Sequence, residues 1–364
     1  MSNMQTKANE VAKIFFGQAP QSIVPFGNGH INSTFLVNNG SKNYILQRIN
    51  TDVFTRPHEV MANIKGVTDH IRKKATLSGA DPKRATLDFK CFPSGNNYFD
   101  DDCGNCWRIY EFIDKTVAYD KVESPRDFYN CANAFGIFQQ QLADYPADTL
   151  HETIVNFHNT PVRYENLMRA IEKNASGRVC EVADEIAFAK AREEFCKTLE
   201  NARAAGELPL RVTHNDTKLN NILFDEETGD PTCVIDLDTV MPGYSVNDFG
   251  DSIRFGANTA VEDETDLSKV SLDIDLFRTF AEGFLKGCNG SLTQKELELL
   301  PIGAMMMTLE CGMRFLTDHI DGDVYFKIHR ENHNLDRCRC QFALVADMER
   351  KLDKMNEIIR ELAK

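Results

Sequence analysis

The sequence has too little positive charge for a nucleic-acid-binding protein. Its 41 Lys and Arg residues are outnumbered by 55 Asp and Glu residues, which gives a formal net charge of −14 at pH 7. Binding to a phosphate backbone requires basic patches, so we expect no nucleic acid as a partner. The acidic balance is still compatible with a cationic small molecule, so charge alone does not identify the ligand.

Long apolar runs are also missing. No stretch approaches the ~18 apolar residues of a membrane-spanning helix, so we expect no membrane partner. Residues 1–19 form a short amphipathic segment with Lys7, Glu10 and Lys13, without a long apolar core or a small-residue cleavage site. We therefore expect no signal peptide.

Regular cysteine spacing is absent, although the chain has 11 cysteines. Cys103-x-x-Cys106 is one candidate pair, but no second pair lies at zinc-ribbon spacing. Cys131, Cys196 and Cys311 fall inside apolar helical patterns, as is typical of reduced, buried thiols. The pattern argues against zinc and favours a cytoplasmic location.

The predicted elements change from strands to helices along the chain. Short β-rich runs separated by turn residues indicate strands at 23–26, 32–37, 44–48, 86–92 and 107–113. Apolar residues at helical spacing indicate helices at 57–72, 128–142, 163–174, 183–204, 273–286, 293–317 and 338–362. A strand-rich part with one helix therefore precedes a helical part.

The most informative stretch is the H-x-D-x-x-x-x-N sequence of residues 214–221, followed by the apolar run 233–235 and Asp236. Phosphoryl transfer needs an oriented nucleophile and divalent cations that neutralise developing charge. One carboxylate beside an acceptor hydroxyl, with an amide oxygen and a second carboxylate on the metal, meets this need. The pattern favours this chemistry over a polar hairpin that ends in a solvated loop.

The chain resembles the aminoglycoside phosphotransferase/choline kinase superfamily of small-molecule kinases. Within it, the chain is similar to the N-acetylhexosamine 1-kinases. The strings that carry the resemblance span nearly the whole chain: FGNGHINSTFLV, YILQRINTDVF, HNDTKLNNILFD, CVIDLDTVMPGYSVNDFGDSIRFGAN and MRFLTDHIDGDVYFKI. The resemblance implies an α+β, bilobal protein-kinase-like fold, ATP and Mg²⁺ as cofactors, a small-molecule sugar as substrate, and no obligate protein partner.

Two lobes follow from this order of elements. We expect a nucleotide-binding lobe over residues 1–113 and a catalytic and acceptor-binding lobe over residues 114–364. The linker at 111–114 would serve as the hinge, and backbone groups of Glu111 and Ile113 could hydrogen-bond an adenine edge.

The resemblance assigns roles within the 214–221 motif and after it. Asp216 matches the catalytic base, and Asn221 and Asp236 match the magnesium ligands. Asp238 could help through a second metal or through water. His214 matches a motif histidine, which we interpret as structural because the adjacent carboxylate already suits the base role.

Two further residues near the motif have more than one interpretation. Asp248-Phe249-Gly250 spells the metal motif of protein kinases, but it follows the hairpin instead of ending its second strand. We interpret Asp248 as a helix N-cap or as an anchor of the catalytic loop. Lys218 could approach the γ-phosphate or could be a solvated loop lysine.

The N-terminal strands offer a phosphate-binding turn. Gly27 and Gly29 open a turn between two strands, where backbone amides can approach phosphate oxygens closely, although an ordinary hairpin turn would look the same. Arg48 stands where protein kinases place a lysine, and its bidentate guanidinium suits the α- and β-phosphates. Glu59, at the start of the next helix, is the candidate partner of Arg48, or a solvated helix-start glutamate.

For the acceptor, the resemblance implicates His30, Arg314 and Tyr325. Arg and Tyr can hydrogen-bond hydroxyl groups and an acetamido carbonyl. The alternative for Arg314 is an ion pair with Glu310 or Asp318 at helical spacing. The rival acceptors are choline, homoserine, methylthioribose or an aminoglycoside, and a nucleotide-binding protein with weak or no catalysis is a further alternative.

Overall fold

The computed structural model describes residues 3–27, 31–119 and 124–364. It divides into two compact units. The first, here the N-terminal unit, comprises Met1–Ala118, Asp144–Val155 and Asn221–Met241. The second, here the helical unit, comprises Tyr119–Ala143, Asn156–Asn220 and Pro242–Lys364. The units are defined by which residues pack together, and the N-terminal unit contains two segments from later in the chain. The lobe boundary at residue 113 therefore stays a prediction.

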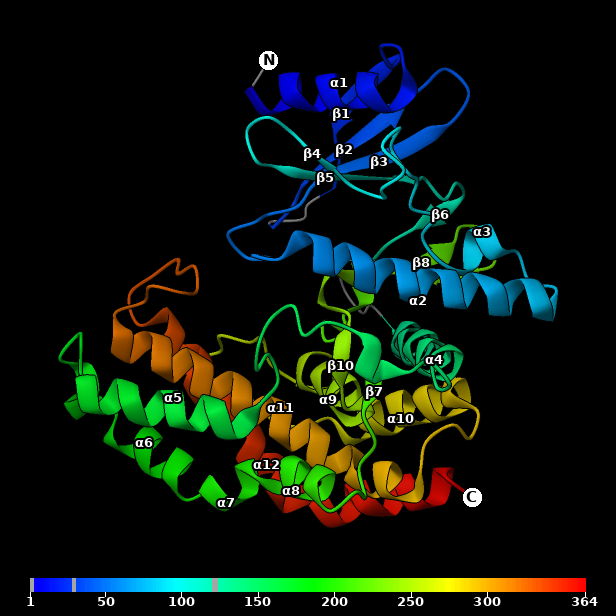
Figure 1. Ribbon diagram of the computed structural model, residues 1–364. Helices are drawn as coiled ribbons and strands as arrows, with labels where there is room; N and C mark the ends of the chain where they lie inside the picture. The colour runs from blue at the N-terminus through cyan, green and yellow to red at the C-terminus, as the bar shows by residue number, and fades with distance from the viewer. Residues whose placement is uncertain (1–2, 28–30, 120–123) are drawn as a thin grey trace. The chain divides into compact units, whose positions relative to one another are not determined.

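A five-stranded antiparallel sheet forms the centre of the N-terminal unit (Figure 1). Its strand order is β1 (Ser22–Pro25), β2 (Ser33–Asn38), β3 (Asn43–Arg48), β5 (Cys106–Glu111) and β4 (Phe99–Asp100). Alternation along β2 buries Phe35 and Val37, which join Leu46 and Trp107 in a core cluster. Helix α1 (Asn3–Phe16) covers this cluster and contributes Val11.

The remainder of the N-terminal unit is built around helix α2 (Pro57–Ser78) and a second sheet. The α2 side chains Val60, Ile64, Val67 and Ile71 recur at helical spacing and are buried. Gly79 ends α2 in the left-handed conformation. The second sheet has the order β6 (Thr116–Val117), β8 (Ile222–Asp225) and β9 (Pro231–Val234), and the one-turn helix α3 (Pro82–Ala85) belongs to the same unit.

Closely packed helices dominate the helical unit. Helices α4 and α10 pack face to face through Gly136, Gly283 and Gly287, where a Cβ would collide with backbone atoms of the facing helix. The buried rings of Phe249 and Phe280 extend this core. The helices are α4 (Pro125–Gln141), α5 (Thr160–Lys173), α6 (Ala183–Lys190), α7 (Glu193–Cys196), α8 (Thr198–Ala204), α9 (Ser245–Gly256), α10 (Ile274–Cys288), α11 (Gln294–Asp321) and α12 (His333–Leu362).

Two predicted elements differ from the structure. The helix expected over 183–204 is broken into α6, α7 and α8. The strand expected over 86–92 is reduced to a single bridge between Phe89 and Tyr110, with backbone hydrogen bonds from Lys90 to Ile109 and from Glu111 to Asp88 on either side. In both cases the segment keeps part of the expected secondary structure, but the regular backbone hydrogen-bond pattern is interrupted.

Helix α11 is long and apolar enough to cross a membrane by length and composition alone. This finding differs from the expectation that no stretch approaches that length. However, 83% of its most apolar window is buried inside the unit, as in the core helix of a soluble protein. Helices α5 and α12 pack against it.

Candidate active site

The loop after β7 (Arg211–Thr213) carries the predicted base, Asp216, and is fixed by Asp248 of α9. The two Asp248 carboxylate oxygens accept hydrogen bonds from the backbone N–H groups of His214 and Asn215, each at 2.8 Å. The Gln139 side chain donates a third, also at 2.8 Å. Burial raises the pKa of Asp248, although these hydrogen bonds oppose that shift. Asp248 is therefore a loop anchor and not an N-cap, since α9 begins at Ser245.

His214 is fully buried and packs against aromatic rings. Its imidazole meets Phe135 and Phe138 edge-on, with ring centroids 5.4 and 5.9 Å away. Its Nδ1 accepts a 3.3 Å hydrogen bond from the Asp216 backbone N–H. This arrangement agrees with the structural role expected for His214.

Asp216 differs from these neighbours because its side chain is partly exposed, at 27%. The Lys218 ammonium lies 2.6 Å from its Oδ1. The loop continues into α9 through two more bonds: the Thr217 hydroxyl donates to the Asp248 carbonyl, and the Ser252 hydroxyl donates to the Thr217 carbonyl. The carboxylate therefore projects from a loop whose backbone is held in place.

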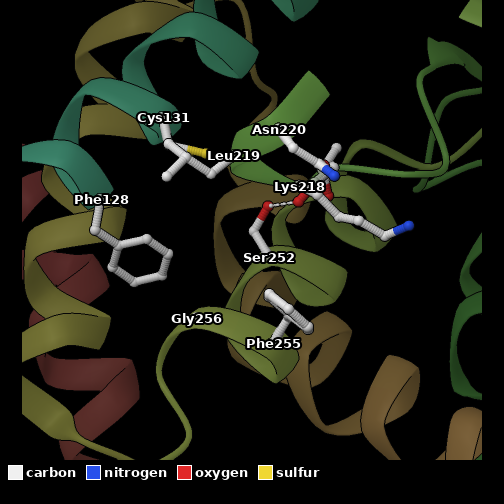
Figure 2. Close-up of a pocket in the computed structure, with 9 residues that line it drawn as sticks. Phe128, Cys131, Lys218, Leu219, Asn220, Ser252, Phe255 and Gly256 are labelled. Atoms are coloured by element: carbon white, nitrogen blue, oxygen red, sulfur yellow. Dashed lines mark hydrogen bonds between the residues drawn. The ribbon is translucent and has the colours of Figure 1, made fainter. Parts of the chain in front are cut away.

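A small cavity of about 50 Å³ lies between this loop and helices α4 and α9 (Figure 2). Figure 2 shows Leu219 and Cys131 pointing toward one another, while the Lys218 side chain extends away from them. Burial raises the pKa of the Cys131 thiol well above its ordinary value, so the thiol is unreactive at neutral pH. A cavity of this volume is too small for a sugar.

The hairpin β8–β9 brings Asn221 and Asp236 to one end of the N-terminal unit. Ile222 pairs with Val234, and the Ile235 N–H donates to the Asn221 carbonyl at 2.8 Å. Asp236 follows directly, in the left-handed conformation with φ of 57°. An amide oxygen and an exposed carboxylate then stand at neighbouring positions, and this set of donors suits Mg²⁺.

Asp238 does not offer a second metal site. Its buried carboxylate accepts hydrogen bonds from both terminal nitrogens of Arg108, one of them at 3.0 Å. It accepts another from the Asn32 side-chain amide at 2.6 Å. Arg108 is anchored in turn by Gln47 on β3, at 2.9 Å. Because every close contact of Asp238 is a hydrogen-bond donor, its role is to join the sheet to the segment that follows Asp236.

Arg48 faces a different partner from the one expected. Its guanidinium donates to Asn105 at 3.1 Å, and its buried Nε has no hydrogen-bond partner within residues 3–27, 31–119 and 124–364. Glu59 instead forms a 2.7 Å ion pair with Arg56, three residues earlier, so the predicted Arg48–Glu59 pair is wrong. Glu59 pairs with Arg56 because residues three apart at a helix start are neighbours on the helix surface.

Only part of the predicted glycine turn is described. Gly27 has φ of 76°, and apart from its chain neighbours no atom of the described residues lies within 4 Å of the place where its Cβ would stand. The backbone there is open to an approaching ligand, as a phosphate-binding turn requires. Gly29 and His30 lie outside the described residues.

In the predicted hinge, the Glu111 side chain is held between two lysines, Lys42 at 2.5 Å and Lys90 at 3.2 Å. The Lys42 hydrogen bond is the largest cause that lowers the pKa of Glu111. The Ile113 carbonyl accepts from Thr116, whereas its N–H donates to no residue in the described part of the chain. That N–H suits a ligand acceptor.

Arg314 lies on α11 with its guanidinium over the rings of Phe157 and Phe326, at 5.9 and 5.4 Å from their centroids. Across residues 3–27, 31–119 and 124–364, no ion pair to Arg314 is found, so the alternative of pairing with Glu310 or Asp318 is wrong. Glu310 is held by His158 and Thr160 at 2.9 and 2.8 Å.

Asp318 holds the segment that carries Tyr325. Its carboxylate accepts backbone hydrogen bonds from Val324, Tyr325 and Phe326, at 2.7 to 2.9 Å. The Asp318 side chain itself is buried. The Tyr325 side chain is 72% exposed.

Two other groups have the residue types of a metal site. They are His58, Asp100 and Cys106, and Asp101, Asp102 and Cys103, all in the N-terminal unit. Burial raises the pKa of Cys106 to about 12, so its thiol stays protonated and is a poor ligand at neutral pH. All 11 cysteines are free thiols.

Comparisons with known proteins agree with this architecture. The sequence profile of the "Phosphotransferase enzyme family" matches residues 22–269. A microcompartment-associated aminopropanol kinase superposes with a TM-score of 0.64 at 16% identity, over 97% of this chain and 98% of the other. An aminoglycoside phosphotransferase from Alicyclobacillus acidocaldarius gives 0.61 at 12% identity, over 94% and 93%.

A third solved structure, the GDP complex of aminoglycoside 2'-phosphotransferase-IIIa, superposes with a TM-score of 0.53 at 12% identity, over 99% of both chains. At these identities the likeness shows the fold. The predicted α+β fold, with a strand-rich N-terminal region and a helical C-terminal region, is confirmed.

Proposed function

The chain belongs to the phosphotransferase enzyme family, and we propose that it is an ATP- and Mg²⁺-dependent kinase for the anomeric hydroxyl of an N-acetylhexosamine. Phosphoryl transfer to an alcohol of a small molecule is the reaction of its family. The choice of a sugar rests on the resemblance of the strings around Asp216 and Arg314. The observation that carries it is Arg314, which has no ion-pair partner in the described chain and lies beside exposed Tyr325 and two aromatic rings.

The catalytic step centres on Asp216. Its carboxylate would orient the anomeric hydroxyl and accept its proton as the oxygen attacks the γ-phosphate. The Asp248 hydrogen bonds keep the backbone of this loop in one conformation, so the base needs little reorganisation before reaction. The product would be a sugar 1-phosphate.

The residues proposed to bind the nucleotide offer hydrogen-bond donors to its phosphate oxygens and its adenine base. The unpartnered Arg48 Nε and the open backbone at Gly27 offer donors to phosphate oxygens. The free Ile113 N–H offers a donor to the adenine edge. Asn221 and Asp236 would hold Mg²⁺, which would neutralise charge on the transferred phosphoryl group.

The relative that was solved with GDP supports a purine nucleotide as the phosphoryl donor. ATP is the donor we propose because the N-acetylhexosamine 1-kinase resemblance implies it. Comparing ATP with GTP at equal concentration tests this choice through the rate of sugar phosphorylation.

An acceptor panel tests the function. N-acetylglucosamine, N-acetylgalactosamine, choline, 1-amino-2-propanol and kanamycin are each incubated with the enzyme, ATP and Mg²⁺, and ADP release is followed. We expect kcat/KM to be highest for one of the two acetylated sugars. A higher value for an amino alcohol or kanamycin would overturn the sugar assignment. ATP binding without turnover of any acceptor would support a nucleotide-binding protein that lacks catalysis.

A further inference from the structure

Arg163, in the first turn of α5, lies in the same part of the helical unit as Arg314 and Tyr325. Helices α5 and α11 pack side by side (Figure 1). Arg163 donates to the Phe157 carbonyl at 2.7 Å, and the Arg314 guanidinium lies over the ring of the same Phe157. Burial and the Arg314 charge lower the pKa of Arg163, while the nearby Glu310 and Tyr325 oppose this shift. The two arginines therefore share Phe157 as a contact.

The donors of Arg163 are not all satisfied within the protein. Its Nε is buried and has no hydrogen-bond partner among the residues that the structure describes. A buried donor without a partner is costly, and a ligand that completes it is one explanation for its retention. No other part of the proposed reaction uses this group.

Among the described residues, Glu310 is the carboxylate that acts on Arg163, and it is already engaged by other donors. Glu310 is buried and accepts hydrogen bonds from His158 and Thr160. Burial raises the pKa of Glu310, but the hydrogen bonds from His158 and Thr160, together with the His158 and Arg314 charges, hold the pKa below its ordinary value. Glu310 therefore has little capacity left to receive an ammonium group.

This group of residues adjoins the base loop. The His158 imidazole bridges from Glu310 toward the loop, with its Nε2 3.5 Å from the carbonyl of Asn215, the residue before Asp216. A molecule held by the two arginines would thus lie near the loop that carries the proposed base.

We propose that Arg163 is a specificity-determining residue. With Arg314 it forms a cationic, hydrogen-bond-donating surface that binds an acceptor bearing a carbonyl or carboxylate oxygen and repels an acceptor bearing an ammonium group. This inference rests on the proposed function, to which it adds the chemical class of the substrate. It distinguishes this chain from the amine-bearing acceptors named for proteins of the same fold.

The test compares two sugars that differ in one group. N-acetylglucosamine carries an acetamido group where glucosamine carries an ammonium group. The wild-type enzyme should prefer N-acetylglucosamine in kcat/KM by about tenfold or more, because a hydrogen bond to a charged group is gained and a like-charge contact is avoided. Arg163→Gln should raise KM for N-acetylglucosamine about tenfold, leave kcat within about threefold, and reduce the preference between the two sugars.

Two further variants separate charge from hydrogen bonding. Arg163→Lys keeps the charge and loses the Nε donor, so it should still disfavour glucosamine while KM for N-acetylglucosamine stays raised. Arg169→Gln, on the exposed side of α5, removes the same charge and should leave both sugars at wild-type values.

The outcomes are distinguishable. Turnover of N-acetylglucosamine with unchanged kinetics in Arg163→Gln would overturn this inference alone. No turnover of any N-acetylhexosamine by the wild-type enzyme would overturn the proposed function, and this inference with it. If Arg163→Gln does not fold, the wild-type enzyme decides, because equal or better use of glucosamine contradicts the inference and a clear preference for N-acetylglucosamine supports it.

Discussion

At the scale of single residues, Asp216 and Asp248 show how surroundings separate two carboxylates of the same site. Asp248 is buried, and its carboxylate oxygens accept hydrogen bonds from three donors, two of which are backbone N–H groups of the loop. Asp216 projects from that loop with a partly exposed carboxylate next to Lys218. An aspartate that is already saturated with donors can fix a backbone, and one that is accessible can accept a proton from a ligand.

Replacing Asp216 by Asn should lower kcat by a factor on the order of 10² or more, because the amide keeps the shape and loses the base. The Kd for ATP, measured by calorimetry, should stay within a few-fold of wild type. Asp230→Asn, an exposed position on the β8–β9 hairpin, serves as the control and should leave kcat unchanged. Near-normal turnover by Asp216→Asn would rule out the assignment of the base.

Replacing Asp236 by Ala should raise the Mg²⁺ concentration for half-maximal rate by at least about tenfold, since one of two proposed ligands is lost. The rate is measured across a Mg²⁺ titration at fixed total ATP. Asp230→Ala removes a carboxylate from the same hairpin and should keep the wild-type titration. An identical Mg²⁺ profile for Asp236→Ala and wild type would contradict the metal assignment.

At the scale of elements, Glu296 of α11 joins three segments of the helical unit. It completes the capping box of its own helix with Thr293. Its carboxylate also accepts from Arg211 on β7, at 2.7 and 2.9 Å, and from Ser245 at the start of α9, at 2.7 Å. The strand that leads into the base loop is thereby attached to the helix that carries Arg314.

Glu296→Ala should lower the free energy of unfolding at pH 7 by about 3–5 kcal/mol, because Arg211 is left without its buried partner. Burial raises the pKa of Glu296, but the hydrogen bonds from Arg211, Thr293 and Ser245 and the Arg211 charge together lower it below 4.5. A carboxyl with a lowered folded-state pKa stabilises above its unfolded pKa and loses this contribution as pH falls. The difference from wild type in urea titrations should therefore shrink below about pH 4.

The matched control is Glu298→Ala, two residues later on the exposed side of α11. It should change the free energy of unfolding by no more than about 0.5 kcal/mol. Equal stabilities of Glu296→Ala and Glu298→Ala at pH 7 would show that the Glu296 contacts contribute nothing.

The sequence predicted the parts of the site that depend on local spacing. The positions of Asn221 and Asp236 at one end of a hairpin, and the structural environment of His214, follow from a short motif and an apolar strand. The Arg48–Glu59 pair was predicted wrongly because Arg56 is closer to Glu59 along the helix. Pairings of this kind depend on packing geometry that spacing does not contain.

Other roles could not be read from the sequence at all. Asp318 appeared as one of several acidic residues, and its three backbone hydrogen bonds depend on the chain turning back after Gly322. Arg163 belongs to no recognisable sequence motif. Its proposed role in acceptor binding depends on the packing of α5 against α11, which brings together residues about 150 positions apart in the sequence.

At the scale of the whole molecule, the proposed groups divide between the two compact units. Gly27, Arg48 and Asp236 belong to the N-terminal unit, whereas Asp216 and Arg314 belong to the helical unit. The proposed phosphate and metal ligands and the proposed base and acceptor residues therefore belong to different units.

A nucleotide should therefore stabilise the protein through Arg48. A nonhydrolysable ATP analogue with Mg²⁺ at about 100 times its Kd adds about 2.7 kcal/mol to the native state, which should raise Tm by a few degrees. Arg48→Ala should lose most of this shift because the unpartnered Nε donor is removed. Arg56→Ala, which removes an exposed arginine of the same unit, should keep it. An unchanged shift in Arg48→Ala would exclude Arg48 from the nucleotide site.

The most direct test of the central claim is the position of the phosphate in the product. The enzyme is incubated with ATP, Mg²⁺ and N-acetylglucosamine, and the product is examined by phosphorus and proton NMR. A coupling between phosphorus and the anomeric proton would establish the sugar 1-phosphate that we predict. Phosphate on another hydroxyl of the sugar, or no sugar phosphate while an amine-bearing alcohol is phosphorylated, would contradict the account.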